Sequence, residues 1–142
     1  MSITLVIYDS VGAILQVTQC APNQAQYQQS PAGGGILATA PIANPSVFIK
    51  QNCVIGGQIV PKVGMGLSVS ATSFPADGTS DVTIGEIPAG ASVMISGAVS
   101  AGPETITDGQ LAITSNVAGS ILVTITAPPM YFDWSITLVS IP

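Results

Sequence analysis

Acidic side chains provide the first candidates for chemistry in this chain. Asp77 and Asp81 lie in the segment ADGTSD, where two carboxylates and the loop carbonyls would offer oxygen ligands to calcium. That ion takes about six to eight oxygens, and only two carboxylates are local. An Asp-Gly turn followed by the polar start of a strand is therefore the favoured interpretation, and no metal site is expected.

Glu104 and Asp108 are a second acidic pair, which could act as a general acid and a general base. They lie on either side of a predicted strand that ends in a turn. Such catalysis needs positioned groups with tuned pKa values, and nothing in the sequence organises a pocket around this pair. The chain contains no His, which excludes a Ser-His-Asp triad, a Cys-His pair and an imidazole metal ligand. We expect no enzyme, no catalytic residue and no cofactor.

The two cysteines, Cys20 and Cys53, permit a disulfide, which the sequence by itself leaves open. Buried free thiols are the favoured alternative, because free cysteine packs as a small hydrophobic residue. Cys20 is not expected to be a nucleophile, since there is no His and no obvious basic neighbour to lower the pKa of its thiol.

The densest aromatic cluster is MYFDW, Met130–Trp134. In a glycan-binding module, Tyr131 and Trp134 would supply flat stacking faces and Asp133 a hydrogen-bond acceptor. In the favoured interpretation, alternate residues of a strand pack into the core, because the single Trp of a small β-domain is usually its core anchor.

The chain contains few charged residues. Of the 142 residues, seven are acidic and two are basic, and charged residues make up 6%, against about 25% in ordinary soluble domains. With Lys50 and Lys62 as the only cations, no nucleic-acid binding is expected. Neutral polar groups cost less to desolvate than charged ones, so the composition favours a subunit that stays inside an assembly. A lone globule with a hydroxyl-rich coat is the alternative.

Neither a targeting segment nor a membrane span is expected. The start of the chain has no basic region, and Asp9 and the turn at Gly12 interrupt it. No apolar stretch reaches the ~18–20 residues that a span needs. The positive mean hydropathy therefore reflects short strands.

Apolar residues recur with a period of two, which predicts an all-β chain. Residues 1–64 are predicted to form a small N-terminal lobe of β-hairpins. The first hairpin pairs Ile3–Tyr8 with Ala13–Gln19. The second spans Cys53–Val60 around Gly56-Gly57, because two glycines can both take the positive φ that a tight turn requires.

Two further elements are expected in this lobe. Ala21–Ser30 is the one helix candidate, and Asn23 would cap it. Ser46–Lys50 is a strand candidate. Lys62–Gly66 is interpreted as a joint between two lobes.

Residues 65–142 are predicted to form an immunoglobulin-like β-sandwich, because short strands follow one another with turn signals about every 8–12 residues. Asp108-Gly109 is predicted to be a two-residue hairpin turn. The strand candidates are Leu67–Ser73, Asp81–Gly85, Ser92–Gly97, Glu104–Thr107, Gln110–Ser115, Ser120–Ala127 and Phe132–Ile141. The expected core residues are Val82, Ile84, Val93, Ile95, Leu111, Ile113, Leu122 or Val123, Ile125, Trp134, Ile136 and Leu138.

The first strand, Ile3–Tyr8, is the main candidate for contact with other subunits. It has no charge before Asp9, and an uncharged strand at a sheet edge invites pairing with another strand. The alternative is that it joins the sheet of its own lobe. The candidate contact residues are Ile3, Leu5, Ile7, Tyr8, Val54, Ile55, Ile59, Tyr131 and Trp134.

Three segments share a pattern of turn residues with a known family: the opening ITLVIYDSVGAILQVTQCAP, the middle VFIKQNCVIGGQIVPK, and the last third, from FPADGTSDVTIGEIPAG to APPMYFDWSITL, which adds one aromatic motif. This pattern resembles small tail-region virion proteins of tailed bacteriophages. The resemblance implies a virion component with an N-terminal hairpin lobe and an immunoglobulin-like lobe. The chain departs from the family pattern in lacking Arg and in its uncharged loops from Gly33 to Pro45.

We therefore expect a bacteriophage virion structural protein, in the tail or tail-fibre attachment region, assembled in the host cytoplasm. Its partners would be other virion proteins and copies of itself, in a ring or lattice held by packing of β-surfaces. A capsid decoration (cement) protein is the first alternative. A glycan-binding adhesion module, with a host glycan as partner, is the second.

Overall fold

The computed structural model describes residues 1–142, of which 50% lie in strands and 9% in helices. The all-β prediction is therefore confirmed. The chain divides into two compact units, Met1–Val63 and Gly64–Pro142, which we call the N-terminal unit and the C-terminal unit. The boundary lies one residue before the expected one.

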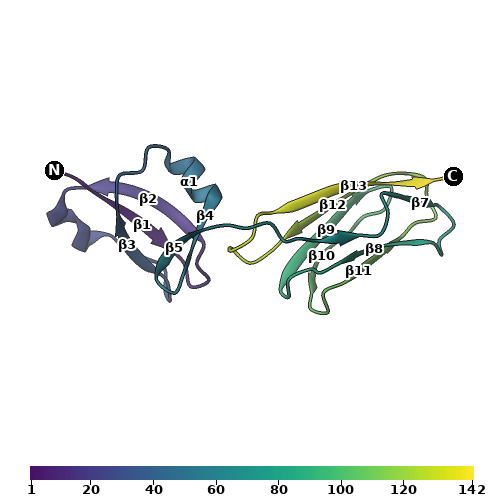
Figure 1. Ribbon diagram of the computed structural model, residues 1–142, viewed down its shortest axis with the longest axis horizontal. Coiled ribbons are helices and arrows are strands. Elements are labelled where there is room, and N and C mark those ends of the chain that lie inside the picture. The colour runs from purple at the N-terminus through teal and green to yellow at the C-terminus, as the bar shows by residue number, and fades with distance from the viewer. The chain divides into compact units, whose positions relative to one another are not determined.

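The N-terminal unit contains a three-stranded antiparallel sheet with β1 (Ile3–Tyr8) between β2 (Ile14–Cys20) and β3 (Gly35–Thr39) (Figure 1). The predicted first hairpin is confirmed, but the prediction that its first strand forms a free edge is wrong. An apolar run such as Thr4–Ile7 suits a central strand covered on both faces, and all four of these residues are buried.

The turn between β1 and β2 forms where the sequence predicts it. Asp9 Oδ1 accepts hydrogen bonds from the backbone N–H groups of Val11 (3.0 Å) and Ala13 (2.9 Å). The Gly12 carbonyl accepts a further bond from the N–H of Val54 (2.9 Å), which ties this turn to β4 (Asn52–Ile55).

The segment predicted to be a strand over Ser46–Lys50 is instead the helix α1 (Pro45–Gln51). Asn44 caps it, with its side chain accepting a bond from the N–H of Val47 (3.3 Å), and Pro45 occupies the first turn, where no N–H is needed. These two start signals outweigh the β-propensity of Val47 and its neighbours.

The helix predicted over Ala21–Ser30 is a shorter 3-10 helix, Pro22–Tyr27. The predicted cap is also wrong, because Ala21 stands at the N-cap and no side chain caps this helix. None of its residues is buried, so no packing favours a longer α-helix.

The Gly56-Gly57 hairpin is confirmed as β4 paired with β5 (Gln58–Pro61). Both glycines have positive φ, 58° and 75°, as a tight hairpin turn requires.

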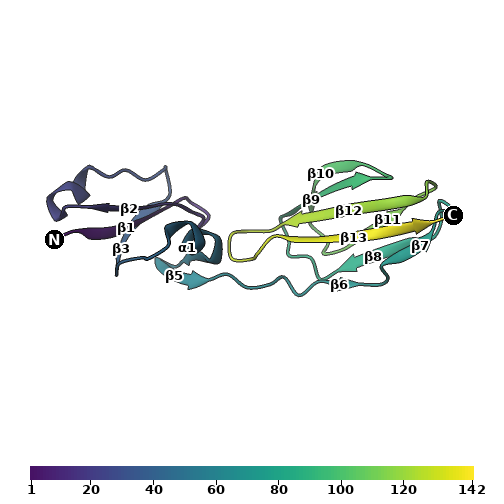
Figure 2. The ribbon, with the colours of Figure 1, turned by 90° about the horizontal axis from the view of Figure 1, so that it is seen from above.

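The C-terminal unit contains two sheets. One has the order β10-β9-β12-β13-β7 and the other β11-β8-β6, and Figure 2 shows β12 and β13 side by side with β7 next to β13. All neighbouring pairs are antiparallel except β13 and β7. The strands are β6 (Ser68–Val69), β7 (Ser73–Pro75), β8 (Asp81–Gly85), β9 (Ala91–Gly97), β10 (Ala101–Ile106), β11 (Leu111–Thr114), β12 (Gly119–Thr126) and β13 (Trp134–Ile141).

Residues of both sheets form one hydrophobic core. Val123, not Leu122, is the inward residue of β12, and Leu122 is exposed. Of the other predicted core residues, Val82, Ile84, Val93, Ile113, Ile125 and Leu138 are buried, while Ile95, Leu111, Trp134 and Ile136 are partly buried against the same cluster. The core also contains residues that the pattern did not predict: Phe74, Ile87, Ala91, Ile106 and Ile121.

Asp108-Gly109 forms a turn, but the predicted hairpin is wrong. Asp108 Oδ1 accepts a bond from the N–H of Gln110 (3.2 Å), and Gly109 has positive φ. The strands on its two sides belong to different sheets, because β10 pairs with β9 and β11 pairs with β8. Local turn chemistry sets the direction of the chain but not the partner of the next strand.

Candidate interaction surfaces

The outer face of the five-stranded sheet carries no charged side chain, and we call it the uncharged face. Side chains alternate between the two faces of a strand, so the register and the burial pattern decide which residues point outward. The core-facing set includes Val93, Val123 and Leu138, which leaves their neighbours on the outer face. The uncharged face consists of Ser73, Pro75, Ser92, Met94, Ser96, Thr105, Ser120, Leu122, Thr124, Thr126, Ser135, Thr137, Val139 and Ile141.

Four large apolar residues on this face are exposed in the isolated chain. The exposed fractions are 47% for Met94, 44% for Leu122, 44% for Val139 and 46% for Ile141. The rest of the face is Ser, Thr and one Pro. Single exposed apolar residues are ordinary, whereas a set on adjacent strands of one face makes that face a candidate contact surface.

Charge is distributed unequally between the units and away from this face. The C-terminal unit has six carboxylates and no Lys or Arg, whereas the N-terminal unit has Asp9, Lys50 and Lys62. Glu104, on β10, lies opposite the inward-facing Val93 and is exposed at the sheet edge. The other five lie outside the five-stranded sheet: Asp77, Asp81, Glu86, Asp108 and Asp133.

Asp77 uses its carboxylate to hold a turn. Oδ1 accepts bonds from the N–H groups of Thr79 (2.9 Å) and Ser80 (2.6 Å), and Oδ2 accepts from the Ser80 hydroxyl (2.7 Å). The bonds from Ser80 and then Thr79 lower the pKa of this carboxyl well below its ordinary value. The structure has no group of three or more His, Cys, Asp or Glu side chains that would hold a metal with it. The geometry fits the turn interpretation of Asp77 and Asp81.

Glu104 and Asp108 do not share a pocket. Glu104 is exposed on β10, and Asp108 is exposed in the following turn, where it binds the N–H of Gln110. Both carboxylates are therefore open to water, without the enclosed surroundings that acid–base catalysis uses.

Both cysteines are free thiols, and Cys53 is buried on β4 while Cys20 is partly exposed at the end of β2. Burial raises the pKa of the Cys53 thiol, and nearby Lys62 acts in the opposite direction with a smaller effect. A thiol whose pKa is raised reacts slowly.

The aromatic cluster is divided between the core and the surface. Trp134 begins β13 and packs against the core cluster, and Tyr131 is partly exposed in the preceding turn. Phe132 and Met130 are exposed, at 41% and 40%. Because the indole of Trp134 packs against the core, little of its face is available for stacking on a sugar ring.

The expected contact residues of the N-terminal unit do not form one surface. Leu5, Ile7 and Val54 are buried, so they cannot contact a partner in this fold. Tyr8 and Ile59 are partly buried against the smaller core cluster, and Ile3 is partly exposed. Ile55 alone is well exposed, at 47%.

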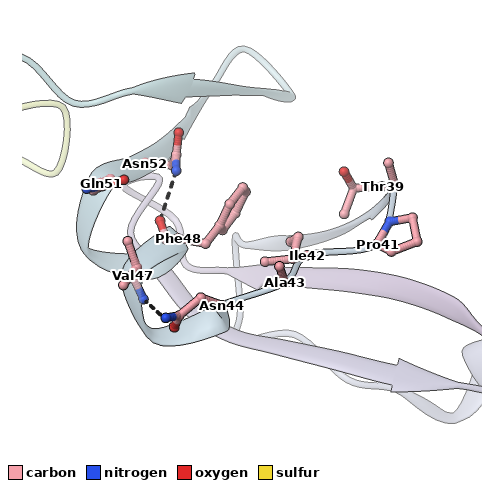
Figure 3. Close-up of a pocket in the computed structure, with 10 residues that line it drawn as sticks. Thr39, Pro41, Ile42, Ala43, Asn44, Val47, Phe48, Gln51 and Asn52 are labelled. Atoms are coloured by element: carbon pink, nitrogen blue, oxygen red, sulfur yellow. Dashed lines mark hydrogen bonds between the residues drawn. The ribbon is translucent and has the colours of Figure 1, made fainter.

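The N-terminal unit contains a pocket of about 390 Å³ between α1 and the segment that leads into it. In Figure 3, the Phe48 ring extends from α1 toward the side where Ile42 and Thr39 lie. Two of the pocket's polar side chains already form hydrogen bonds within the protein. Asn44 caps α1, and Asn52 donates to the Phe48 carbonyl (3.0 Å). The lining contains no ionisable side chain, so it offers no group for catalysis.

A second pocket, of about 310 Å³, lies between the β1–β2 and β4–β5 turns. Tyr8 and Asp9 contribute its only ionisable side chains. The Asp9 carboxylate already holds its own turn through Val11 and Ala13. Neither pocket contains Glu104, Asp108 or an aromatic residue of the Met130–Trp134 cluster.

The uncharged face was not predicted, although the sequence contains a signal for it. Alternate residues of the last two strands, such as Thr124, Thr126, Ser135 and Thr137, are hydroxyl side chains. The pattern alone does not show that β9, β12 and β13 are adjacent, and only that pairing assembles scattered positions into one face.

No helix in the structure has the length and apolar character needed to cross a bilayer. No family model, curated protein or solved structure matches the chain.

Proposed function

We propose that the protein is a non-enzymatic structural subunit of a multi-copy assembly, and that the assembly is the tail region of a bacteriophage virion. The observation that carries the assembly role is the uncharged face, with Met94, Leu122, Val139 and Ile141 exposed on a sheet that lacks any outward charge. Neutral side chains are desolvated at lower cost than ions, so such a face suits permanent contact. The virion placement rests on the sequence resemblance described above.

We further propose that the C-terminal unit is an immunoglobulin-like sandwich. The order β11-β8-β6 corresponds to strands E, B and A of that fold, and β9, β12 and β13 correspond to C, F and G. β10 takes the place of the additional strand C′. The unit has no inter-sheet disulfide, since neither cysteine lies in it, and the apolar core described above supplies the stability instead.

A non-enzymatic role is supported by how the acidic groups are used. Asp77, Asp9 and Asp108 hold turns through backbone N–H groups, and Glu104 is exposed on an edge strand. The glycan-binding alternative has less support, because Trp134 packs against the core. Capsid decoration uses the same kind of surface, and location in the particle separates it from the tail.

Immunogold labelling of purified virions with an antibody against the C-terminal unit tests the proposal. Label confined to the tail supports it, and label spread over the shell favours capsid decoration. Absence of the protein from purified particles would overturn the virion assignment.

A second experiment tests whether the uncharged face is the contact surface. It compares the incorporation into virions of Leu122→Lys with that of the matched variant Leu15→Lys on β2, because Leu15 is exposed to a similar extent, 54%.

A further inference from the structure

The exposed apolar residues of the uncharged face form a diagonal ridge across adjacent strands. Met94 on β9 lies opposite Thr124 on β12, one outward position from Leu122. Leu122 in turn lies opposite Thr137 on β13, one outward position from Val139. Diagonal neighbours in a sheet are about 7–8 Å apart, within reach of long side chains. The ridge therefore continues over three strands, with hydroxyl side chains on both sides.

We propose that the occupant of this face is a second copy of the chain, packed sheet to sheet about a two-fold axis near Leu122. This inference rests on the proposed assembly role and names the partner at the same surface. β12 is the middle strand of the five, so an axis there places Leu122 against the Leu122 of the partner subunit. The hydroxyl side chains beside one ridge then meet those beside the other.

The size of the face suits a weak, specific dimer. Five strands about 4.8 Å apart, with the central ones spanning seven or eight residues at about 3.3 Å each, cover about 500 Å². Two such faces together reach about 1,000 Å², the lower bound for a specific interface. An interface of this size suits a dimer that dissociates on dilution.

Charge favours a second copy over a charged partner. A basic or acidic protein would find no complementary charge on this face, whereas an identical face brings no like charges into direct contact. The six carboxylates of each C-terminal unit still repel the other unit at longer range. Salt screens that repulsion, so dimerisation should strengthen as ionic strength rises.

The edges of the five-stranded sheet are poorly suited to pairing, so its face is better suited to association than its edges. β10 has a register shift, Pro103 and the charged Glu104 within six residues. At the opposite edge, β7 is three residues long and ends at Pro75. Proline, bulges, charges and short strands all block the addition of another strand.

Sedimentation equilibrium of the full chain, at concentrations up to about 1 mM, tests the proposal. Wild type should dimerise, more tightly at higher salt. Leu122→Lys should weaken the dimer by about 30-fold or more, because it buries an unpaired charge at the centre, and Leu15→Lys should leave it unchanged. Both sites are exposed, so both variants should fold, which far-ultraviolet circular dichroism checks.

A cross-link tests the position of the axis. In a Cys20→Ser background, Leu122→Cys should form a disulfide-linked dimer on mild oxidation, whereas Ala112→Cys, exposed on β11 of the other sheet, should not. A monomeric wild type, or a dimer that Leu122→Lys leaves intact, would overturn the inference. Labelling of virions is independent of these results, so a monomer that is still found in tails rejects the dimer and keeps the proposed function.

Discussion

The two units differ in the number of apolar side chains that they bury. The C-terminal unit buries twelve apolar side chains in one cluster, whereas the N-terminal unit buries six, of which three form its cluster. Specific local contacts add to this smaller core in the N-terminal unit: the Gly12–Val54 backbone bond, the Asn44 cap and the bond from Asn52 to Phe48. The C-terminal unit has contacts of the same kind, such as the bonds that Asp77 accepts from Ser80. Because the N-terminal unit buries fewer apolar side chains, each local contact should make up a larger share of its stability.

The largest expected effect is a cavity in the C-terminal core. Leu138→Ala removes a side chain with 0% exposure and should cost about 2–5 kcal/mol of unfolding free energy. Trp134 is the only Trp, so its fluorescence during urea unfolding reports on this unit. Leu122→Ala, on the outer face of the adjacent strand, is the control and should have a much smaller effect. Equal losses would contradict the placement of the core.

The next effect concerns a backbone contact of the N-terminal unit. Gly12 has φ of 92°, and a Cβ there would overlap the Val54 carbonyl oxygen, so Gly12→Ala should cost about 1–3 kcal/mol. Gly56 also has positive φ, but a Cβ there would meet no neighbouring atom. Gly56→Ala should therefore cost only about 1 kcal/mol of unfolding free energy. Hydrogen exchange of peptides from residues 1–63 measures both. A smaller loss for Gly12→Ala would show that the Val54 contact is unimportant.

Removal of the Asn44 cap tests another local contact of the N-terminal unit, with a smaller expected loss of stability than Gly12→Ala. Asn44→Ala removes the side chain that accepts the Val47 N–H and should cost about 1 kcal/mol, seen as faster exchange over Pro45–Gln51. Asn23→Ala is the matched control, because Asn23 lies in the 3-10 helix, whose N-terminus no side chain caps. Similar changes in exchange for the two variants would argue against the cap.

The smallest effect is expected from a local contact in the C-terminal unit. The pKa of Asp77 is lowered in the fold, so its carboxylate stabilises the turn above its ordinary pKa of 3.8 and loses this contribution as the pH falls further. Asp77→Asn should therefore lower the urea midpoint slightly at neutral pH, and the difference should shrink on acidification. Asp133→Asn, also exposed, is the control. A difference that grows at low pH would reverse the sign of the assigned shift.

Turns and strand positions were largely predictable from the sequence, whereas strand partners were not. Gly56-Gly57 and the Asp9–Gly12 turn formed as predicted, because their conformation depends on adjacent residues. Asp108-Gly109 also formed a turn, but its strands joined different sheets. That choice depends on the distant residues that complete the core.

The prediction for Ser46–Lys50 failed for a different reason. The start signals Asn44 and Pro45 were present in the sequence, but Ser46–Lys50 was predicted to be a strand without weighing them. The uncharged face could not be predicted residue by residue, because its members are separated by up to 68 positions, from Ser73 to Ile141. Only the register between distant strands shows that they share a surface.

The protected edges of the five-stranded sheet have a consequence for chains crowded at high local concentration. A sheet with open, apolar edges recruits identical strands and grows into cross-β fibrils. Pro103 and Glu104 on one side and the short, proline-terminated β7 on the other interrupt that growth at both ends of this sheet. Many copies of the chain can therefore be concentrated without the edges of this sheet seeding fibrils.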